Sequence, residues 1–187
     1  ITYHEFGQNM NLIDQYKEMH KDENLYAGSA TTLHKESIRQ FIVVSNSKTM
    51  LDYGCGKAAQ YFKENIHNDY FYSIMPSLYD PAVEQYSVLP EGKFDMVICT
   101  DVLEHIEEQD IPSIIQEIYS KANNFVYLGI CNSPADSFLP DGRNSHVTQK
   151  PLSWWVEQIQ PYADIHTLVF VYGKNKEKAF LRNKQRI

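Results

Sequence analysis

Three things are scarce in this sequence of 187 residues: cysteine, positive charge and long apolar runs. No apolar run approaches the roughly 20 residues that a membrane-spanning helix needs, so we expect no membrane span, and we also expect no secretory leader. The three cysteines are too few and too scattered for a disulfide framework. We therefore expect reduced thiols and a cytoplasmic protein.

The shortage of positive charge limits the partners. The formal net charge is -7, whereas a general nucleic-acid binder usually carries a basic surface. We therefore expect no nucleic-acid partner, and the lack of long apolar runs predicts no membrane partner either. The length fits one domain, residues 1–187, and a hydrophobic content of 43% is ordinary for a globular protein with a sizeable core.

The three cysteines raise the question of a metal site. Cys55, Cys99 and Cys131 fall at or near the ends of three expected strands, with His105 and His146 not far away in the expected fold. No pair among these residues has the close spacing of a zinc motif. Small buried hydrophobic side chains explain the cysteines better, so we expect no metal.

The stretch MLDYGCGKAAQ, residues 50–60, is the organising feature of the chain. A short apolar run breaks at Gly54-Cys55-Gly56 and is followed by a run with helical character, residues 58–66. Glycines allow positive φ and a close approach of the backbone to a ligand. The free N–H groups at a helix start would face whatever lies above the turn. The pattern predicts a strand over residues 49–53, a tight turn and a helix, a unit that binds many nucleotide-like cofactors.

Strands and helices alternate after this turn. Residues 94–100, FDMVICT, and residues 125–131 are apolar runs typical of strands buried on both faces, and between them apolar residues over 111–119 recur at helical spacing. This alternation predicts an α/β fold with a mostly parallel sheet. Two strand-like runs, 165–172 and 177–182, flank a glycine turn and predict a closing antiparallel hairpin.

Two segments have no strand signal. Residues 1–45 show helical spacing in parts, and we expect them to pack against the sheet as an N-terminal helical cap. Residues 132–150 form a long polar loop, and a loop of that length in a compact domain is usually functional or disordered.

Taken in order, LDYGCGKAA, YDPAV and FDMVICTDVLEHI, with a further strand and a closing hairpin, resemble the class I S-adenosylmethionine-dependent methyltransferases. The resemblance covers residues 26–182 and depends on the order and spacing of motifs that are weak singly. In that family the first motif contains D-x-G-x-G, which Asp52, Gly54 and Gly56 match, while Ala58 stands where a third glycine is usual.

The resemblance implies a Rossmann-like, doubly wound sheet. The segment between Asp80 and Phe94 is too short for the family's usual helix and strand, so we expect the third strand to be reduced or missing. The family likeness of SHVTQKPLSWW, residues 145–155, also implies that the loop 132–150 is a substrate lid that carries His146 over the site.

The cofactor implied by the resemblance is S-adenosylmethionine, with S-adenosylhomocysteine as product. The N–H groups of residues 54–57, including that of Cys55, would cradle its methionine part, and Asp52 would attract its ammonium group. Asp80, followed by Pro81, would accept hydrogen bonds from both ribose hydroxyls. The other expected cofactor-binding residues belong to the exit of the 94–100 strand and to an N-terminal lid: Thr100, Asp101, Val102, Tyr26 and Gly28.

Glu104, His105 and His146 are the candidate catalytic or substrate-binding residues. A general base must reach the substrate proton with a pKa near the working pH, which histidine offers without tuning. Methyl transfer is also a displacement in which positioning can suffice, so no base is guaranteed. Glu104 has an alternative role as a capping or paired residue, and His105 as a hydrogen-bonded structural histidine.

The sequence therefore predicts an enzyme that transfers a methyl group to an oxygen or nitrogen of a small molecule. A second hypothesis is a cofactor-binding protein of the same fold that has lost the transfer. A nicotinamide dehydrogenase ranks last, because GCGKAA lacks the sixth-position glycine of G-x-G-x-x-G and the LEH motif would go unexplained.

Overall fold

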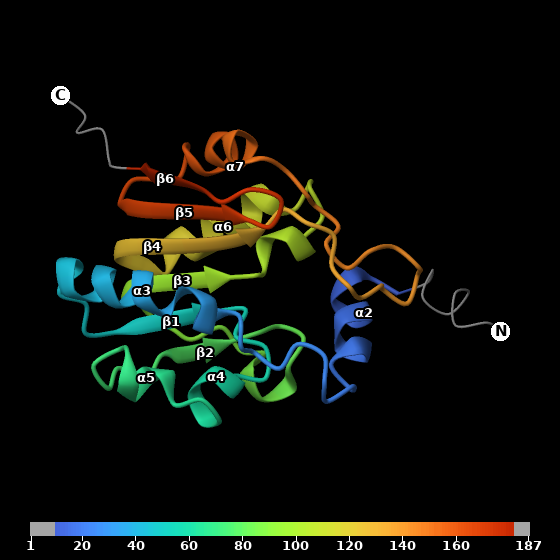
Figure 1. The fold of residues 1–187 in the computed structure, drawn as a ribbon, viewed down its shortest axis with the longest axis horizontal. Helices are drawn as coiled ribbons and strands as arrows, with labels where there is room; N and C mark the ends of the chain where they lie inside the picture. Colours follow the sequence, from blue (N-terminus) through green and yellow to red (C-terminus); the bar gives the residue numbers. More distant parts are fainter. Residues whose placement is uncertain (1–9, 182–187) are drawn as a thin grey trace.

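The computed structural model describes residues 10–181, and a six-stranded sheet runs through its middle (Figure 1). The strands are β1 (Met50–Tyr53), β2 (Ser77–Tyr79), β3 (Phe94–Thr100), β4 (Ala122–Cys131), β5 (His166–Tyr172) and β6 (Glu177–Leu181). Their order in the sheet is β2-β1-β3-β4-β5-β6, and each neighbouring pair is parallel except β5 with β6. The predicted α/β fold, with a mostly parallel sheet and a C-terminal antiparallel hairpin, is confirmed.

Helices cover both faces of the sheet (Figure 1). The helices α3 (Thr31–Ser45), α4 (Ala59–Phe62) and α5 (Ile66–Asp69) pack on one face, and α6 (Ile111–Ser120) and α7 (Leu152–Ile159) pack on the other. Successive strand residues point to opposite faces, so Met96 joins the cluster beneath α3 while Val97 joins the cluster beneath α6. Two buried layers around one sheet make this a Rossmann-like, doubly wound fold.

The third strand, which we expected to be reduced or missing, is absent from the described residues. Between β2 and β3 the chain forms only a short 3-10 helix, η1 (Glu84–Tyr86). A parallel crossover through a helix needs a dozen or more residues, and a further strand with its own crossover would need more than this segment offers. The chain therefore passes directly from β2, at the sheet edge, to β3 on the other side of β1.

The helix predicted over residues 58–66 is broken into two pieces. The first piece, α4, ends at Phe62, and Asn65 takes a left-handed φ of 57° before α5 begins. Helical spacing of apolar residues does not reveal such a break, because it depends on one backbone conformation that most residues avoid. Tyr61 of α4 and Ile66 of α5 still pack into the same buried cluster.

The carboxyl ends of the parallel strands are covered by two segments that lie side by side. These are the helix α2 (Leu12–Met19) and the loop between β4 and α7 (Figure 1). Part of the helical cap predicted over 1–45 lies outside the described residues, and the domain boundaries stay a prediction. None of the helices within residues 10–181 combines the length and apolar character needed to cross a membrane.

Candidate active site

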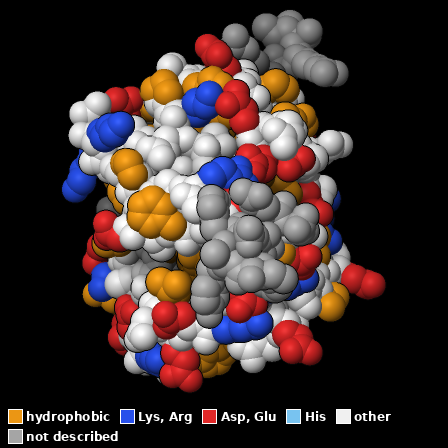
Figure 2. Space-filling view, turned by 90° about the vertical axis from the view of Figure 1, so that its right-hand side faces the viewer, with side chains coloured by type: hydrophobic (Ala, Val, Ile, Leu, Met, Phe, Trp, Pro, Cys, Tyr) orange, Lys and Arg blue, Asp and Glu red, His pale blue; other side chains and the backbone are white. Residues whose placement is uncertain are grey.

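A cavity of about 860 Å³ opens at the carboxyl ends of β1, β2 and β3, beneath α2 and the lid loop. Pockets for small ligands are usually about 300–1,000 Å³, so this one has room for a nucleoside-sized cofactor. The predicted site residues that line it are Tyr26, Gly28, Gly54, Gly56, Asp80, Pro81, Thr100, Asp101, Val102, His105 and His146. Asp52, Cys55 and Glu104 are buried and are not among the lining residues. Figure 2 faces this end of the molecule, where apolar and charged side chains are interspersed.

Two positions at the turn after β1 have space only for glycine: Gly54 within the turn and Gly28 in the N-terminal segment that contacts it. Gly54 has φ +85°, and a Cβ atom there would lie 2.1 Å from a methyl carbon of Val102. Gly28 has φ +77°, and a Cβ atom there would lie 2.2 Å from the carbonyl oxygen of Cys55. Both the left-handed backbone and the lack of space exclude a side chain. The N-terminal segment around Gly28 is thus packed directly against the turn, and its role at the cofactor stays a prediction.

The N–H groups of the turn are not free. Each has an acceptor: Gly54 and Cys55 donate to the Tyr79 carbonyl (2.7 and 3.0 Å), Gly56 to the Asp80 carboxylate (2.9 Å), and Lys57 to the Tyr26 carbonyl (3.2 Å). The expectation that these donors stand open to cradle a ligand is therefore wrong for this structure. The acceptors come from the end of β2 and from the segment before α3, which local sequence around the turn cannot reveal.

Asp80 directly follows β2, and a backbone N–H group holds each of its two carboxylate oxygens in place. One oxygen accepts from the Gly56 N–H and the other from the Ala82 N–H, each at 2.9 Å. A carboxylate oxygen has more than one acceptor position, so each retains capacity for a further donor. Asp80 is 9% exposed and lines the cavity, where it presents two acceptors suited to a pair of hydroxyl groups.

Asp52 lies in the core beneath the turn. One of its oxygens accepts from the Gln60 side-chain amide at 2.8 Å and from the Tyr61 hydroxyl at 2.7 Å. Burial raises the pKa of this carboxyl to about 7. These contacts hold α4 against β1, and the role of Asp52 as a ligand for an ammonium group stays a prediction. Burial likewise raises the pKa of the neighbouring Cys55 thiol.

The exit of β3 carries an unusual backbone at Asp101, whose φ is 56°. A non-glycine residue held in this left-handed region stores strain that the surroundings must offset. The Tyr172 hydroxyl donates to its carboxylate, and Thr100 just before it shares a 2.8 Å hydrogen bond with Thr31 at the start of α3. Burial raises the pKa of Asp101, against the Tyr172 bond that lowers it. The turn brings Val102 over Gly54 and places all three exit residues in the cavity wall.

His105 is fixed in a neutral, defined tautomer. Its Nδ1 lies 2.9 Å from the Ser145 carbonyl, which can only accept, so Nδ1 carries the proton and Nε2 keeps a lone pair. The Tyr16 hydroxyl donates to the same carbonyl at 2.7 Å. Burial, followed by the charge of His146, lowers the pKa of His105 to about 3, so the ring is uncharged at neutral pH.

His146 lies beside His105 and is held in the same way. Its Nδ1 lies 2.6 Å from the Ser133 carbonyl, and its backbone N–H donates to the Asn144 side chain at 3.0 Å. The two imidazole rings meet edge to face with their centroids 4.7 Å apart. The structure thus brings both predicted histidines to the lid end of the cavity, each with Nδ1 occupied by a backbone carbonyl.

Glu104, the third predicted catalytic residue, is fully buried. Its carboxylate accepts the Cys131 N–H at 2.7 Å, and its backbone carbonyl accepts the Thr148 N–H at 3.0 Å. Burial raises the pKa of Glu104 well above its ordinary value. The residue joins the exit of β3 to the end of β4 and to the lid, and a catalytic role for it stays a prediction.

The sequence did not single out α2 as part of the site. Tyr16 of α2 and His20, the residue that follows this helix, line the cavity, and the ring centroids of His20 and Tyr26 lie 5.1 Å apart. The only local signal is weak helical periodicity, which does not show where a helix will dock. Tyr16 and Ser145, which hydrogen-bond across the cavity, are 129 positions apart in the chain.

Comparison with known families matches residues 31–168 to a model described as a methyltransferase domain. The match extends from the start of α3 into β5, and so includes the glycine turn, Asp80, the exit of β3 and both histidines. No curated protein matches the chain.

Proposed function

Because the chain belongs to the methyltransferase domain family, we propose that it transfers a methyl group from S-adenosylmethionine to an oxygen or nitrogen of a small molecule. One observation carries the proposal: a single cavity has an anchored carboxylate, Asp80, at one end and two imidazoles with occupied Nδ1 atoms at the other. When bound, the cofactor supplies a methyl group activated by its sulfonium and leaves as S-adenosylhomocysteine.

The cofactor end fits a nucleoside by shape and by acceptors. Asp80 offers an acceptor on each carboxylate oxygen, which suits the two ribose hydroxyls. The glycines at 28 and 54 keep the wall free of side chains where the backbone comes closest. Thr100, Asp101 and Val102 line the middle of the cavity, and we assign to them the methionine part of the cofactor.

We assign binding of the acceptor molecule to the lid end of the cavity. The bonds to Ser145 and Ser133 occupy Nδ1 of His105 and of His146, so Nε2 is the ring nitrogen that each histidine can offer to the acceptor molecule. Because burial lowers the pKa of His105 to about 3, we assign to His105 the orientation of the acceptor and to His146 the removal of a proton from it. The Tyr16 hydroxyl ties α2 to the lid and so helps to exclude water from the cavity. Where the acceptor already carries a free lone pair, holding it in line is enough.

The first test is calorimetric titration of the full chain with S-adenosylmethionine, S-adenosylhomocysteine and NAD in parallel. We expect both sulfur ligands to bind and NAD not to bind. Failure of a folded protein, shown to be free of bound cofactor, to bind either sulfur ligand would overturn the proposed enzyme function.

Two variants test the division of roles within the cavity. Asp80→Ala should weaken S-adenosylhomocysteine binding by about tenfold or more, since hydrogen bonds to charged groups contribute about 1.5–3 kcal/mol. His146→Ala should leave that affinity intact and lower turnover with an acceptor found by screening. Asp69→Ala, at an exposed position away from the cavity, is the matched control. Equal losses of binding in the Asp80 and His146 variants would contradict the assignment.

A second candidate is a cofactor-binding protein of the same fold without transfer activity. The burial of Glu104, the carboxylate of the LEH motif, away from the cavity favours it. Binding of S-adenosylmethionine with no methylated product across a broad acceptor screen would support this candidate over the enzyme.

A further inference from the structure

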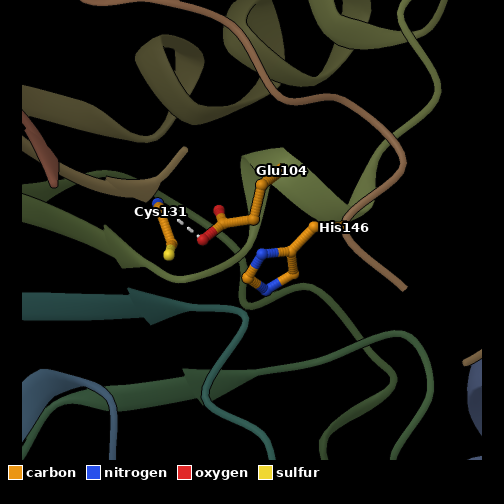
Figure 3. A group of neighbouring side chains, drawn as sticks. All are labelled: Glu104, Cys131 and His146. Atoms are coloured by element: carbon orange, nitrogen blue, oxygen red, sulfur yellow. Dashed lines mark hydrogen bonds between the residues drawn. The ribbon is translucent and has the colours of Figure 1, made fainter. Parts of the chain in front are cut away.

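Three potential metal ligands converge behind the lid end of the cavity (Figure 3). Glu104 belongs to the short 3-10 helix η2 (Leu103–His105), Cys131 is the last residue of β4, and His146 comes from the lid loop. One ligand atom from each lies within 4.8 Å of the other two. We propose that these three side chains bind a divalent metal ion of the zinc type.

The three ligands are far apart in the sequence and form no recognisable motif. The sequence predicts no metal because it has no closely spaced ligands of the zinc-motif type, and these residues occupy the distant positions 104, 131 and 146. They meet because the carboxyl ends of the neighbouring parallel strands β3 and β4 lie side by side, and the lid folds back over both.

An independent observation at Glu104 supports the binding of a cation. The residue has no exposed surface, and one carboxylate oxygen has no hydrogen-bond partner among the described residues. The other oxygen accepts the Cys131 N–H at 2.7 Å, which fixes the carboxylate in place. Figure 3 shows it pointing into the space between Cys131 and His146. A buried carboxylate oxygen without a partner is costly, and a bound cation would remove that penalty.

The three donors favour a borderline metal. Thiolate, imidazole and carboxylate together are ligands of Zn²⁺, whereas Mg²⁺ and Ca²⁺ prefer oxygen alone. Three protein ligands leave a fourth position of a tetrahedral ion open. Because His146 also lines the cavity, the open position would be near the acceptor molecule.

The imidazole of His146 constrains how the ion is held. Its Nδ1 carries the proton that it donates to the Ser133 carbonyl at 2.6 Å. A metal must take an unprotonated nitrogen, so binding either uses Nε2 and keeps this bond or breaks it and releases the proton. In either case the ion joins the exit of β3, the end of β4 and the lid loop, so it should stabilise the protein against unfolding.

The experiment uses the full chain after removal of metals by a chelator. Co²⁺ is the probe, because a cysteine thiolate bound to it gives a charge-transfer absorption band and tetrahedral coordination gives visible bands. We expect one Co²⁺ per chain with a thiolate band, competition by Zn²⁺, and a higher Tm with Zn²⁺. These readouts are independent of methyl transfer, so they can fail while the proposed function stands.

Variants locate the site. Cys131→Ser should lose the thiolate band, and Glu104→Gln, which keeps the side-chain shape, should lower the Co²⁺ affinity by about tenfold or more. Cys99→Ala removes a buried thiol outside the group and should bind Co²⁺ as the parent protein does. Absence of Co²⁺ binding, binding without a thiolate band, or a band that survives in Cys131→Ser would overturn the inference. If a variant fails to fold, the presence or absence of the thiolate band in the Co²⁺ spectrum of the parent protein is the deciding result.

Discussion

Gly54 shows how a single missing methyl group shapes the cavity wall. Its left-handed φ of +85° and the Val102 side chain, 2.1 Å from where a Cβ atom would lie, both act against alanine. Gly92 has nearly the same φ, +79°, but nothing within 4 Å of its own Cβ position. The two positions therefore separate backbone strain from steric exclusion.

We predict that Gly54→Ala destabilises the protein more than Gly92→Ala. The φ penalty, about 1–3 kcal/mol, is shared by both, while only Gly54→Ala forces Val102 to move, which adds about 1–3 kcal/mol. Urea unfolding of the two variants measures the difference. Equal destabilisation would show that Val102 moves aside without penalty, and Gly54→Ala with Val102→Ala should recover part of the loss.

At the scale of elements, α3 is held to the sheet by a buried histidine. His34 is 2% exposed, and its Nδ1 lies 3.0 Å from the Tyr127 hydroxyl on β4. Its ring also meets that of Tyr172 on β5, and Lys178 on β6 is the charged group that acts on it. Burial first, and the Lys178 charge second, lower the pKa of His34 to about 4.

This lowered pKa predicts a loss of stability in mild acid. The ordinary pKa of histidine, 6.5, applies to the unfolded chain, and the pKa of His34 in the folded protein is about 4. Between these two pH values His34 binds a proton in the unfolded state but stays unprotonated in the folded state. Stability should therefore fall as the pH falls through this window, by about 3 kcal/mol at most. In urea unfolding at pH 5 and pH 7, His34→Gln should reduce the difference, and His166→Gln, at an exposed position, should not. An unchanged difference in His34→Gln would contradict the assignment.

The pairing of α2 with the lid loop is a second property of elements. The Tyr16 hydroxyl donates to the Ser145 carbonyl, and the Gln15 amide donates to the Asp141 carboxylate at 2.9 Å. We predict that Tyr16→Phe removes about 1 kcal/mol of stability and speeds hydrogen exchange within residues 132–150. Tyr162→Phe, whose hydroxyl has no hydrogen bond among the described contacts, is the control. Equal exchange in both variants would mean that the hydroxyl does not hold the lid.

At the scale of the whole molecule, the helices on both faces share one sheet. The buried cluster beneath α6 and α7 includes residues of β1, β3, β4 and β5, and the cluster beneath α3 includes residues of the same four strands. No described part of the sheet has a core of its own. Loss of either layer would expose the other face of the same strands.

We therefore predict that residues 1–187 unfold in one cooperative transition. Trp155 is a fully buried residue on the inner side of α7, so its fluorescence reports on one face of the sheet, while far-UV circular dichroism reports on all helices and strands. The two signals should change at the same urea concentration. Separate midpoints would show that one layer unfolds independently and would contradict a single domain.

Local patterns in the sequence determined the order of elements and identified eleven of the residues that line the cavity. Runs such as residues 94–100 are strands of mostly apolar residues, because helices cover both faces of the sheet there, and this pattern is visible in the chain itself. Asp80 was also identified correctly as the residue after β2, because the end of a parallel strand is marked by an abrupt change from apolar to polar residues. Its predicted role at the cofactor awaits the binding experiment.

Only the tertiary structure decided which backbone donors are occupied and which distant side chains meet. The turn at residues 54–57 has the composition of an open cradle, yet carbonyls from Tyr26 and Tyr79 take three of its four N–H groups. Likewise, Glu104, Cys131 and His146 have no common pattern in the chain. The physical reason is the same in both cases: hydrogen bonds and metal ligation depend on separations of a few ångström in space. Local periodicity encodes only which face of an element is buried.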